Sequence, residues 1–396
     1  MATVFYSEGP VTAQLFFDRD DELRALLNIV RDIENGIGRR VAILGPRRIG
    51  KSSLIRELVR RCSEMNIDVS FIIIGLHMVK DERTLLRVMR EAIYDRIYGP
   101  LSRVYHRLLD LLKSLKVDLV FLKKELIEDV IHELRNILKA IAEFSEKKTI
   151  VLVIDEFQNV MRIREFSWIL KELTDNYPKF SFILTGSHYK LASKALDRGG
   201  GLYGIPKVIR LDPISKKYCI EFLKERYELA KKPYDEDALD RIYWWSGGHP
   251  WILQKIGEET LNYPKITLEV VDDAAEKIRD DVYLLLGLMY DDLTETEKNL
   301  LSLLPSTPKN IARKLDMTEQ NALILLRNLI IKGFVKKISR GHYDYLNPYI
   351  QQFFKGMPVW PSPPMKKKYM MVLEALEKAE KLSVPSICRI TGLTPR

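Results

Sequence analysis

"ILGPRRIGKSSLIREL", residues 43–58, is the stretch of the sequence from which the fold is predicted. It holds the spacing G-x-x-x-x-G-K-[ST], with the apolar run VAIL before it and the helix-forming segment SLIRELV after it. The glycines of such a loop let the backbone wrap closely around phosphate oxygens, and the next helix presents its positive N-terminal end to them. The stretch therefore predicts a strand, a phosphate-binding loop and a helix in direct succession.

The loop also predicts a ligand, which is ATP or ADP together with Mg²⁺. The motif places the Lys51 ammonium at the β- and γ-phosphates and makes the Ser52 hydroxyl a ligand of Mg²⁺. The residues expected to contact the nucleotide through this loop are Gly45, Pro46, Arg47, Arg48, Ile49, Gly50, Lys51, Ser52 and Ser53.

A second motif, IVLVIDE at residues 150–156, ends an apolar run in two acids. In a parallel sheet the carboxyl ends of the strands form the edge at which ligands bind. Asp155 is therefore expected to hold the Mg²⁺ shell, through water, and Glu156 to act as the general base that polarises an attacking water. The alternative is a strand that simply ends in polar residues, and it carries more weight for Glu156 than for Asp155.

Residues 179–189, KFSFILTGSHY, predict another strand with a polar exit. Thr185 or Ser187 could sense the γ-phosphate and the attacking water there, and Ser187 is favoured as the catalytic residue. The alternative is an ordinary exit from strand to loop. His188 is interpreted as a loop histidine.

The order of the patterns predicts the fold class. Five apolar runs, at residues 39–45, 68–78, 147–157, 179–189 and 207–215, alternate with helical patterns. Their continuous apolarity is typical of strands covered on both faces, which indicates the α/β parallel sheet of a P-loop NTPase. We expect this domain at residues 1–212, with a helical insertion at about 81–147. Residues 213–290 carry only helical patterns and are expected to form a small helical domain.

Residues 291–355 predict a winged-helix domain, with three helices and then a hairpin around Arg340 and Gly341. In a DNA-binding version the third helix enters the major groove. The candidate contacts are Gln320, Asn321 and Arg327 on that helix and Lys336, Lys337 and Arg340 on the wing. Nearby acids, Asp316 and Glu319, give equal weight to the alternative of a regulatory arm that packs on the ATPase domain.

Composition limits the class of protein. Sixty-three Lys and Arg against 54 Asp and Glu give a net charge of +9, which suits double-stranded DNA as a partner but also a mixed charged surface. Three scattered cysteines make neither a metal spacing nor a disulfide framework. No apolar run approaches the roughly 20 residues that span a bilayer, and no secretory signal is evident. These features predict a cytoplasmic protein without a membrane partner.

The C-terminal residues 356–396 are expected to form a proline-rich linker and a partial helical tail. The tail resembles the first two helices of a further winged-helix domain. Either the chain is truncated there or the likeness is accidental.

Taken in order, the motifs resemble archaeal-type P-loop ATPases of the STAND group, which are related to AAA+ and origin-recognition ATPases. The residues that carry the resemblance are FDRDDEL, GPRRIGKSSL, VLVIDEFQ, FILTGS, LYG and GGHPWILQ, within about 15–285. The resemblance implies an ASCE/AAA+-like core, a helical lid, a winged helix and a nucleotide-controlled switch. Phe17 and Arg19 would lie near the adenine. Gly248 and Pro250 would close the lid over the base, and the same GGHP also suits a helix stop and restart.

One position departs from the family pattern. The family commonly has an arginine after the LYG glycine, where this chain has Ile205. An arginine beside the developing phosphoryl charge is worth about 10³–10⁵ in rate. Arg198, Lys207 or Arg210 could substitute, or a second copy or another protein could supply one. We therefore expect slow or partner-dependent hydrolysis. The alternatives are a DNA-binding initiator-like or mobile-element ATPase and a non-hydrolysing regulatory scaffold.

Overall fold

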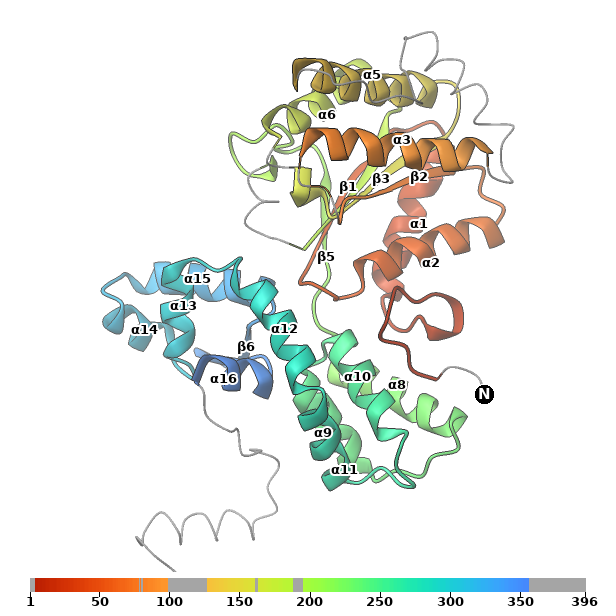
Figure 1. The fold of residues 1–396 in the computed structure, drawn as a ribbon. Coiled ribbons are helices and arrows are strands. Elements are labelled where there is room, and N and C mark those ends of the chain that lie inside the picture. Colours follow the sequence, from red (N-terminus) through yellow and green to blue (C-terminus); the bar gives the residue numbers. More distant parts are fainter. Residues whose placement is uncertain are drawn as a thin grey trace, which may run out of the picture.

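The computed structural model describes residues 4–77, 79, 81–98, 127–160, 163–187 and 195–355. The predicted linker and tail at 356–396 lie outside these residues, as does His188. Figure 1 shows a body built on a parallel sheet and, beside it, two groups of helices formed by the C-terminal half of the described chain.

The sheet has five parallel strands in the order β2-β3-β4-β1-β5. They are β1 (Arg40–Leu44), β2 (Ser70–Gly75), β3 (Ile150–Asp155), β4 (Ser181–Gly186) and β5 (Lys207–Arg210). Because β4 lies between β1 and β3, the loop after β1 and the acids after β3 flank the end of β4. The predicted α/β parallel sheet is confirmed, and its order brings the three predicted motifs to one edge.

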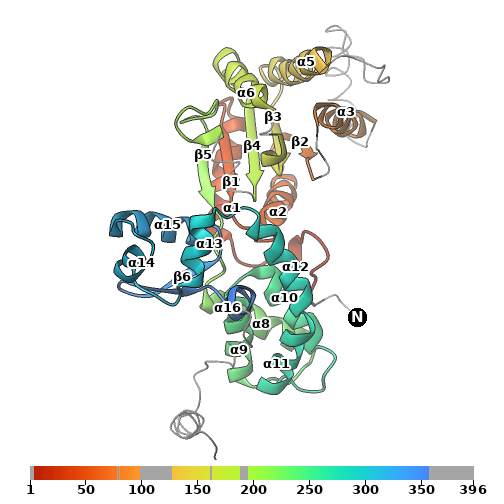
Figure 2. The ribbon, with the colours of Figure 1, turned by 60° about the vertical axis from the view of Figure 1, so that its left-hand side comes forward.

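Helices cover both faces of this sheet (Figure 2). One face packs on α1 (Asp20–Glu34) and α2 (Lys51–Glu64), and the other on α3 (Glu82–Tyr98), α5 (Ile127–Ser145) and α6 (Arg164–Asn176). Successive residues of β3 enter the two cores in turn: Val151 and Val153 face α1 and α2, whereas Leu152 and Ile154 face the other three helices. Burial on both faces explains why the strands read as continuous apolar runs.

The helices that follow β5 are α8 (Lys216–Leu229), α9 (Glu236–Ser246), α10 (Pro250–Thr260), α11 (Leu268–Lys277) and α12 (Arg279–Tyr290). The helices α11 and α12 meet at Ile278, which ends the first and precedes the second. Gly247, with φ +59°, ends α9 in the left-handed conformation, and Pro250 is the first residue of α10. GGHP is thus a helix stop and restart.

Residues 295–355 form α13 (Glu295–Ser302), α14 (Pro308–Lys314), α15 (Glu319–Ile331), the antiparallel strands β6 (Val335–Ser339) and β7 (His342–Tyr345), and α16 (Pro348–Lys355). The last helix has no counterpart among the predicted elements. Its Tyr349 is buried and donates to the Ala275 carbonyl at 2.8 Å. Side chains of α8–α12 and of this segment share one hydrophobic core, so the two groups of helices pack directly on each other.

Among the residues that the structure describes, no helix combines the length and the apolar composition needed to cross a membrane.

Candidate functional site

A cavity of about 450 Å³ lies between the phosphate-binding loop, the N-terminal segment and helices α10 and α12. Of the predicted nucleotide contacts, Phe17, Arg19, Pro250 and residues 47–53 line it, together with Glu156. The fold thus brings together residues that lie more than 200 positions apart in the sequence.

The loop has the backbone that its sequence predicted. Gly50, with φ +102°, directly precedes α2 in a conformation that glycine adopts without strain. A Cβ at Gly45 would come 2.7 Å from the Leu211 carbonyl oxygen, so a larger residue would not fit beside the chain that follows β5. Close packing therefore requires glycine at one end of the loop, and a left-handed turn favours it at the other.

Lys51 is buried inside the loop. Its Nζ donates to the carbonyl oxygens of Gly45 at 3.0 Å and Pro46 at 2.8 Å. Burial lowers the pKa of Lys51 to about 8, although the carboxylates of Glu156 and Asp155 act in the opposite direction. Anionic oxygens beside this buried ammonium would stabilise its charged form.

Ser52 and Asp155 meet across 103 positions of sequence, and the Ser52 hydroxyl donates to Asp155 Oδ2 at 2.8 Å. Thr185 donates to the other carboxylate oxygen of Asp155. A hydroxyl and a carboxylate are the hard oxygen ligands that Mg²⁺ takes, so the residues present fit the ion. No group of three His, Cys, Asp or Glu side chains in the described ranges could hold a metal alone, so the other ligands would come from phosphate and water.

Glu156 directly follows β3 with a φ of +59°, and its backbone N–H donates to Thr185 Oγ1 at 3.2 Å. Its Oε2 accepts from Ser187 Oγ at 2.7 Å and from Gln158 Nε2. Ser187, predicted to sense phosphate, is thus bonded to the predicted base. Gln158 was not identified as a site residue from the sequence, although it stands in the quoted VLVIDEFQ.

The GGHP segment meets the loop through a residue that sequence analysis missed. His249 is buried, and its Nε2 lies 2.9 Å from the Arg47 carbonyl oxygen. Burial lowers the pKa of His249 to about 4. Gly248 was expected to close over the nucleotide base, but it does not line the cavity. Its φ is +79°, and a Cβ there would lie 2.1 Å from the Ile214 carbonyl oxygen, so the glycine serves close backbone packing.

The N-terminal segment 6–11 forms a further wall of the cavity. The Tyr6 N–H donates to Gln254 Oε1 on α10 at 2.8 Å, and the Val11 N–H donates to Ser53 Oγ on α2 at 3.1 Å. This segment therefore links α10 to the phosphate-binding loop. Nothing in its local sequence signals this role, because both partners are distant in the chain.

The first of the adenine candidates, Phe17, packs on Phe222 with ring centroids 5.1 Å apart. Arg19 is buried and donates to the Asp212 carbonyl oxygen at 2.5 Å. The Arg48 guanidinium lies 4.3 Å from the ring centroid of Trp251. This contact gives Arg48 a partner on α10 that the sequence did not reveal.

None of the three cations considered as substitutes for the missing arginine lines the cavity. Ile205 is half-buried and packs against the hydrophobic core on the α3, α5 and α6 side of the sheet. Arg198, Lys207 and Arg210 are exposed, and none of them lines the cavity. Within the described part of the chain, the cations that do so are Arg19, Arg47, Arg48 and Lys51.

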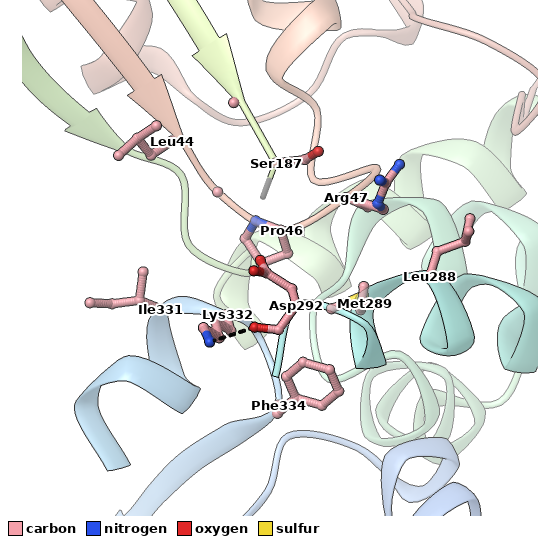
Figure 3. A pocket seen from close by; sticks show the side chains of 12 residues that line it. Leu44, Pro46, Arg47, Ser187, Leu288, Met289, Asp292, Ile331, Lys332 and Phe334 are labelled. Carbon is pink, nitrogen blue, oxygen red and sulfur yellow. Dashed lines mark hydrogen bonds between the residues drawn. The ribbon is translucent and has the colours of Figure 1, made fainter. Parts of the chain in front are cut away.

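The opposite side of the loop contacts the C-terminal helices (Figure 3). A pocket beneath Pro46 and Arg47 is lined by Leu288 and Met289 of α12 and by Ile331, Lys332 and Phe334 around the end of α15. A Cβ at Gly333 would lie 2.7 Å from Pro46 Cγ. The turn between α15 and β6 therefore packs directly on the phosphate-binding loop.

Comparison with known proteins identifies the family of the chain. The family model described as an ATPase domain predominantly from Archaea matches residues 16–256. The chain belongs to this family of ATPases. A comparison of the ATPase with curated proteins finds no match.

Solved structures show the same fold as this ATPase. The Walker-type ATPase of Pyrococcus abyssi is 20% identical, with a TM-score of 0.60, and the alignment covers 89% of this chain and all of that one. The ORC2 protein of Aeropyrum pernix, solved in ADPNP–ADP complexes, is 14% identical, with a TM-score of 0.55, over 89% of this chain and 97% of that one. These likenesses confirm the P-loop ATPase fold.

The residues of the ATPase that were predicted to contact DNA differ in the exposure of their side chains. Gln320, Asn321 and Arg327 on α15 are exposed, as are Lys337 and Arg340 on the hairpin. Lys336 is half-buried instead, and its Nζ donates to the Leu346 carbonyl oxygen at 3.0 Å. Burial lowers the pKa of Lys336. Its ammonium therefore has a structural partner that the sequence did not reveal.

Proposed function

We propose that the ATPase binds ATP with Mg²⁺ in the cavity beside the loop and hydrolyses it slowly, as a nucleotide-controlled switch. In this proposal residues 1–212 are the ATPase domain, 213–290 the lid and 291–355 a winged-helix output domain. The observation that carries it is the hydrogen bond between Ser52 and Asp155, which joins the end of the phosphate-binding loop to the acid that ends β3.

Each residue has a defined task in this scheme. Lys51 neutralises phosphate oxygens from inside the loop, and Ser52 and Asp155 hold Mg²⁺. The ion, when bound, offsets the charge of the phosphate groups. Glu156 accepts a proton from the water that attacks the γ-phosphorus, and the bond between that phosphorus and the bridging oxygen of ADP breaks.

Slow turnover follows from what lines the cavity. A cation beside the transferring phosphoryl group raises the rate by about 10³–10⁵, and Ile205 cannot supply one. Arg47 and Arg48 belong to the loop itself, where the Arg48 guanidinium stacks on Trp251. Because Arg198, Lys207 and Arg210 do not line the cavity, we expect fast hydrolysis to depend on an arginine from a second copy or another protein.

Glu156→Gln tests the chemistry. We expect steady-state phosphate release to fall by about 10²–10³-fold, because an amide cannot accept the proton of water. Binding of a non-hydrolysable ATP analogue should stay within about threefold, since the change keeps the shape of the side chain. Glu165→Gln, the same chemical change at an exposed position on α6, serves as the control. Equal rates in wild type and Glu156→Gln would mean that hydrolysis does not depend on Glu156, and a wild type that releases no phosphate would favour a non-hydrolysing regulatory scaffold.

A second function, DNA binding by an initiator-like or mobile-element ATPase, is favoured by the exposure of Arg327, Lys337 and Arg340. If the hairpin contacts phosphate, Arg340→Ala should reduce the slope of log K against log salt by about one unit. Lys217→Ala, at an exposed position on α8, should leave the slope unchanged. The measurement is fluorescence anisotropy of a labelled duplex at several salt concentrations. Wild-type protein without salt-dependent binding would exclude this function.

A further inference from the structure

We infer that Gln158 is a positioning residue for hydrolysis, which holds the Glu156 carboxylate and the Ser187 hydroxyl in one hydrogen-bonded unit. The inference rests on the proposed role of Glu156 as the general base. Gln158 lies in η2 (Phe157–Val160), the short helix that begins immediately after Glu156. Its exposed fraction is 1%.

The three side chains form a closed network. Gln158 Nε2 donates to Glu156 Oε2 and also to Ser187 Oγ at 3.1 Å. Gln158 Oε1 accepts the Ser187 backbone N–H at 3.3 Å. The Ser187 hydroxyl completes the network by donating to Glu156 Oε2 at 2.7 Å. Both polar atoms of the buried amide thus have hydrogen-bond partners. The partners belong to Glu156 and Ser187, which are the two residues proposed to take part in hydrolysis.

A primary amide suits this position chemically. It offers two N–H donors and a carbonyl acceptor, so it can serve a carboxylate, a hydroxyl and a backbone N–H together. It is neutral and does not titrate, so it orients the base without competing for the proton. A carboxylate at the same position would repel Glu156.

Backbone packing keeps the amide in place. Phe157 is fully buried, and a Cβ at Gly186 would lie 2.8 Å from Phe157 Cε1 and 3.3 Å from Gln158 Oε1. The end of β4 therefore approaches η2 as closely as glycine allows. The left-handed φ of Glu156, +59°, is a further constrained feature at this point.

The two carboxylate oxygens of Glu156 differ in their hydrogen bonds. Oε2 accepts two hydrogen bonds, whereas Oε1 has no hydrogen-bond partner within the described residues. Oε1 is therefore the oxygen free to accept a proton from water. The Ser187 hydroxyl has one proton, and in this arrangement it goes to Glu156 and is not available to a phosphate oxygen.

Gln158→Met is the first test, because methionine keeps the volume of the side chain and removes its hydrogen bonds. We expect kcat to fall by about 10²-fold through loss of orientation, with analogue binding within about threefold of wild type. Asn159→Leu is the matched control: it removes a side-chain amide that donates to the Leu76 carbonyl at 2.7 Å and keeps the backbone N–H that donates to the Glu156 carbonyl at 3.0 Å. That variant should keep wild-type kcat.

Gln158→Glu is the second test, and its readout reports whether the side chain at position 158 lies against the Glu156 carboxylate. Two adjacent carboxylates resist joint ionisation, so the acidic limb of the pH profile of kcat should move to higher pH. The pH profile of kcat for Gln158→Glu also tests the inference if Gln158→Met does not fold. An unmoved acidic limb would overturn the inference.

A double-variant cycle separates this inference from the proposed function. If Gln158 acts through Glu156, adding Gln158→Met to Glu156→Gln should lower kcat no further. A slow Glu156→Gln together with a Gln158→Met that keeps the wild-type rate would overturn the role of Gln158 alone. A Glu156→Gln as fast as wild type would instead remove the proposed base.

Discussion

Lys51→Ala is expected to weaken binding of ATP by about 10²-fold, because in the proposed complex the buried ammonium would make charge-assisted hydrogen bonds to phosphate oxygens, which alanine cannot make. Among the described residues, this ammonium has only the carbonyl oxygens of Gly45 and Pro46 as hydrogen-bond acceptors. Titration calorimetry with an ATP analogue measures the effect. Arg56→Ala, at an exposed position on the same helix, should bind as wild type does.

The pH dependence of wild-type binding gives an independent check on Lys51. Burial lowers the pKa of Lys51 to about 8, so its ammonium loses the proton at a lower pH than an exposed lysine does. Bound phosphate stabilises the charged form and therefore raises the pKa in the complex. Affinity should then fall as the pH rises through about 8, by up to tenfold per pH unit. Affinity that is constant across this range would contradict the proposed contact.

Lys332→Met is expected to lower the free energy of unfolding by about 3–5 kcal/mol, because it leaves a buried carboxylate without its cation. Lys332 Nζ donates to both oxygens of Glu297, at 3.0 and 2.8 Å, and to the Asp292 carbonyl at 2.9 Å, and both side chains are buried. Figure 3 shows the bond to Asp292 below the loop. Urea unfolding followed by circular dichroism measures the loss.

Two further variants identify the cause of that loss. Replacing both partners, in Glu297→Leu with Lys332→Met, should recover most of the stability, because no unpaired charge remains buried. Lys217→Ala, which breaks an exposed ion pair with Glu221, should change stability little. A Lys332→Met protein as stable as wild type would show that Glu297 finds another partner or becomes neutral.

Much of the fold was predictable from local patterns. The strand, loop and helix around residues 43–58 follow from glycine spacing and apolar runs, and the acids that end β3 follow from the same logic. Those patterns repeat over a few residues, so they are visible in a single chain. Helix α16 was not predicted, because its packing on α12 and α9 depends on distant partners.

The site was predictable only in part. Residues 47–53 of the loop, Glu156, Phe17, Arg19 and Pro250 do line one cavity, whereas Gly45 and Pro46 line the pocket on the other side of the loop. Other features depend on contacts between distant segments, and no local pattern encodes such contacts: they include the bond from His249 to the loop, the N-terminal wall at 6–11 and the inward turn of Lys336.

By itself, the sequence determined the class of the protein and the chemistry available to it, because phosphate binding depends on a short loop whose residue types are dictated by backbone geometry. The tertiary structure decided which groups act on one another. The strand order places β4 between β1 and β3, and this brings Ser187 to Glu156 and Asp155 to Ser52. Hydrogen bonds extend over about 3 Å, so only the folded chain can specify them.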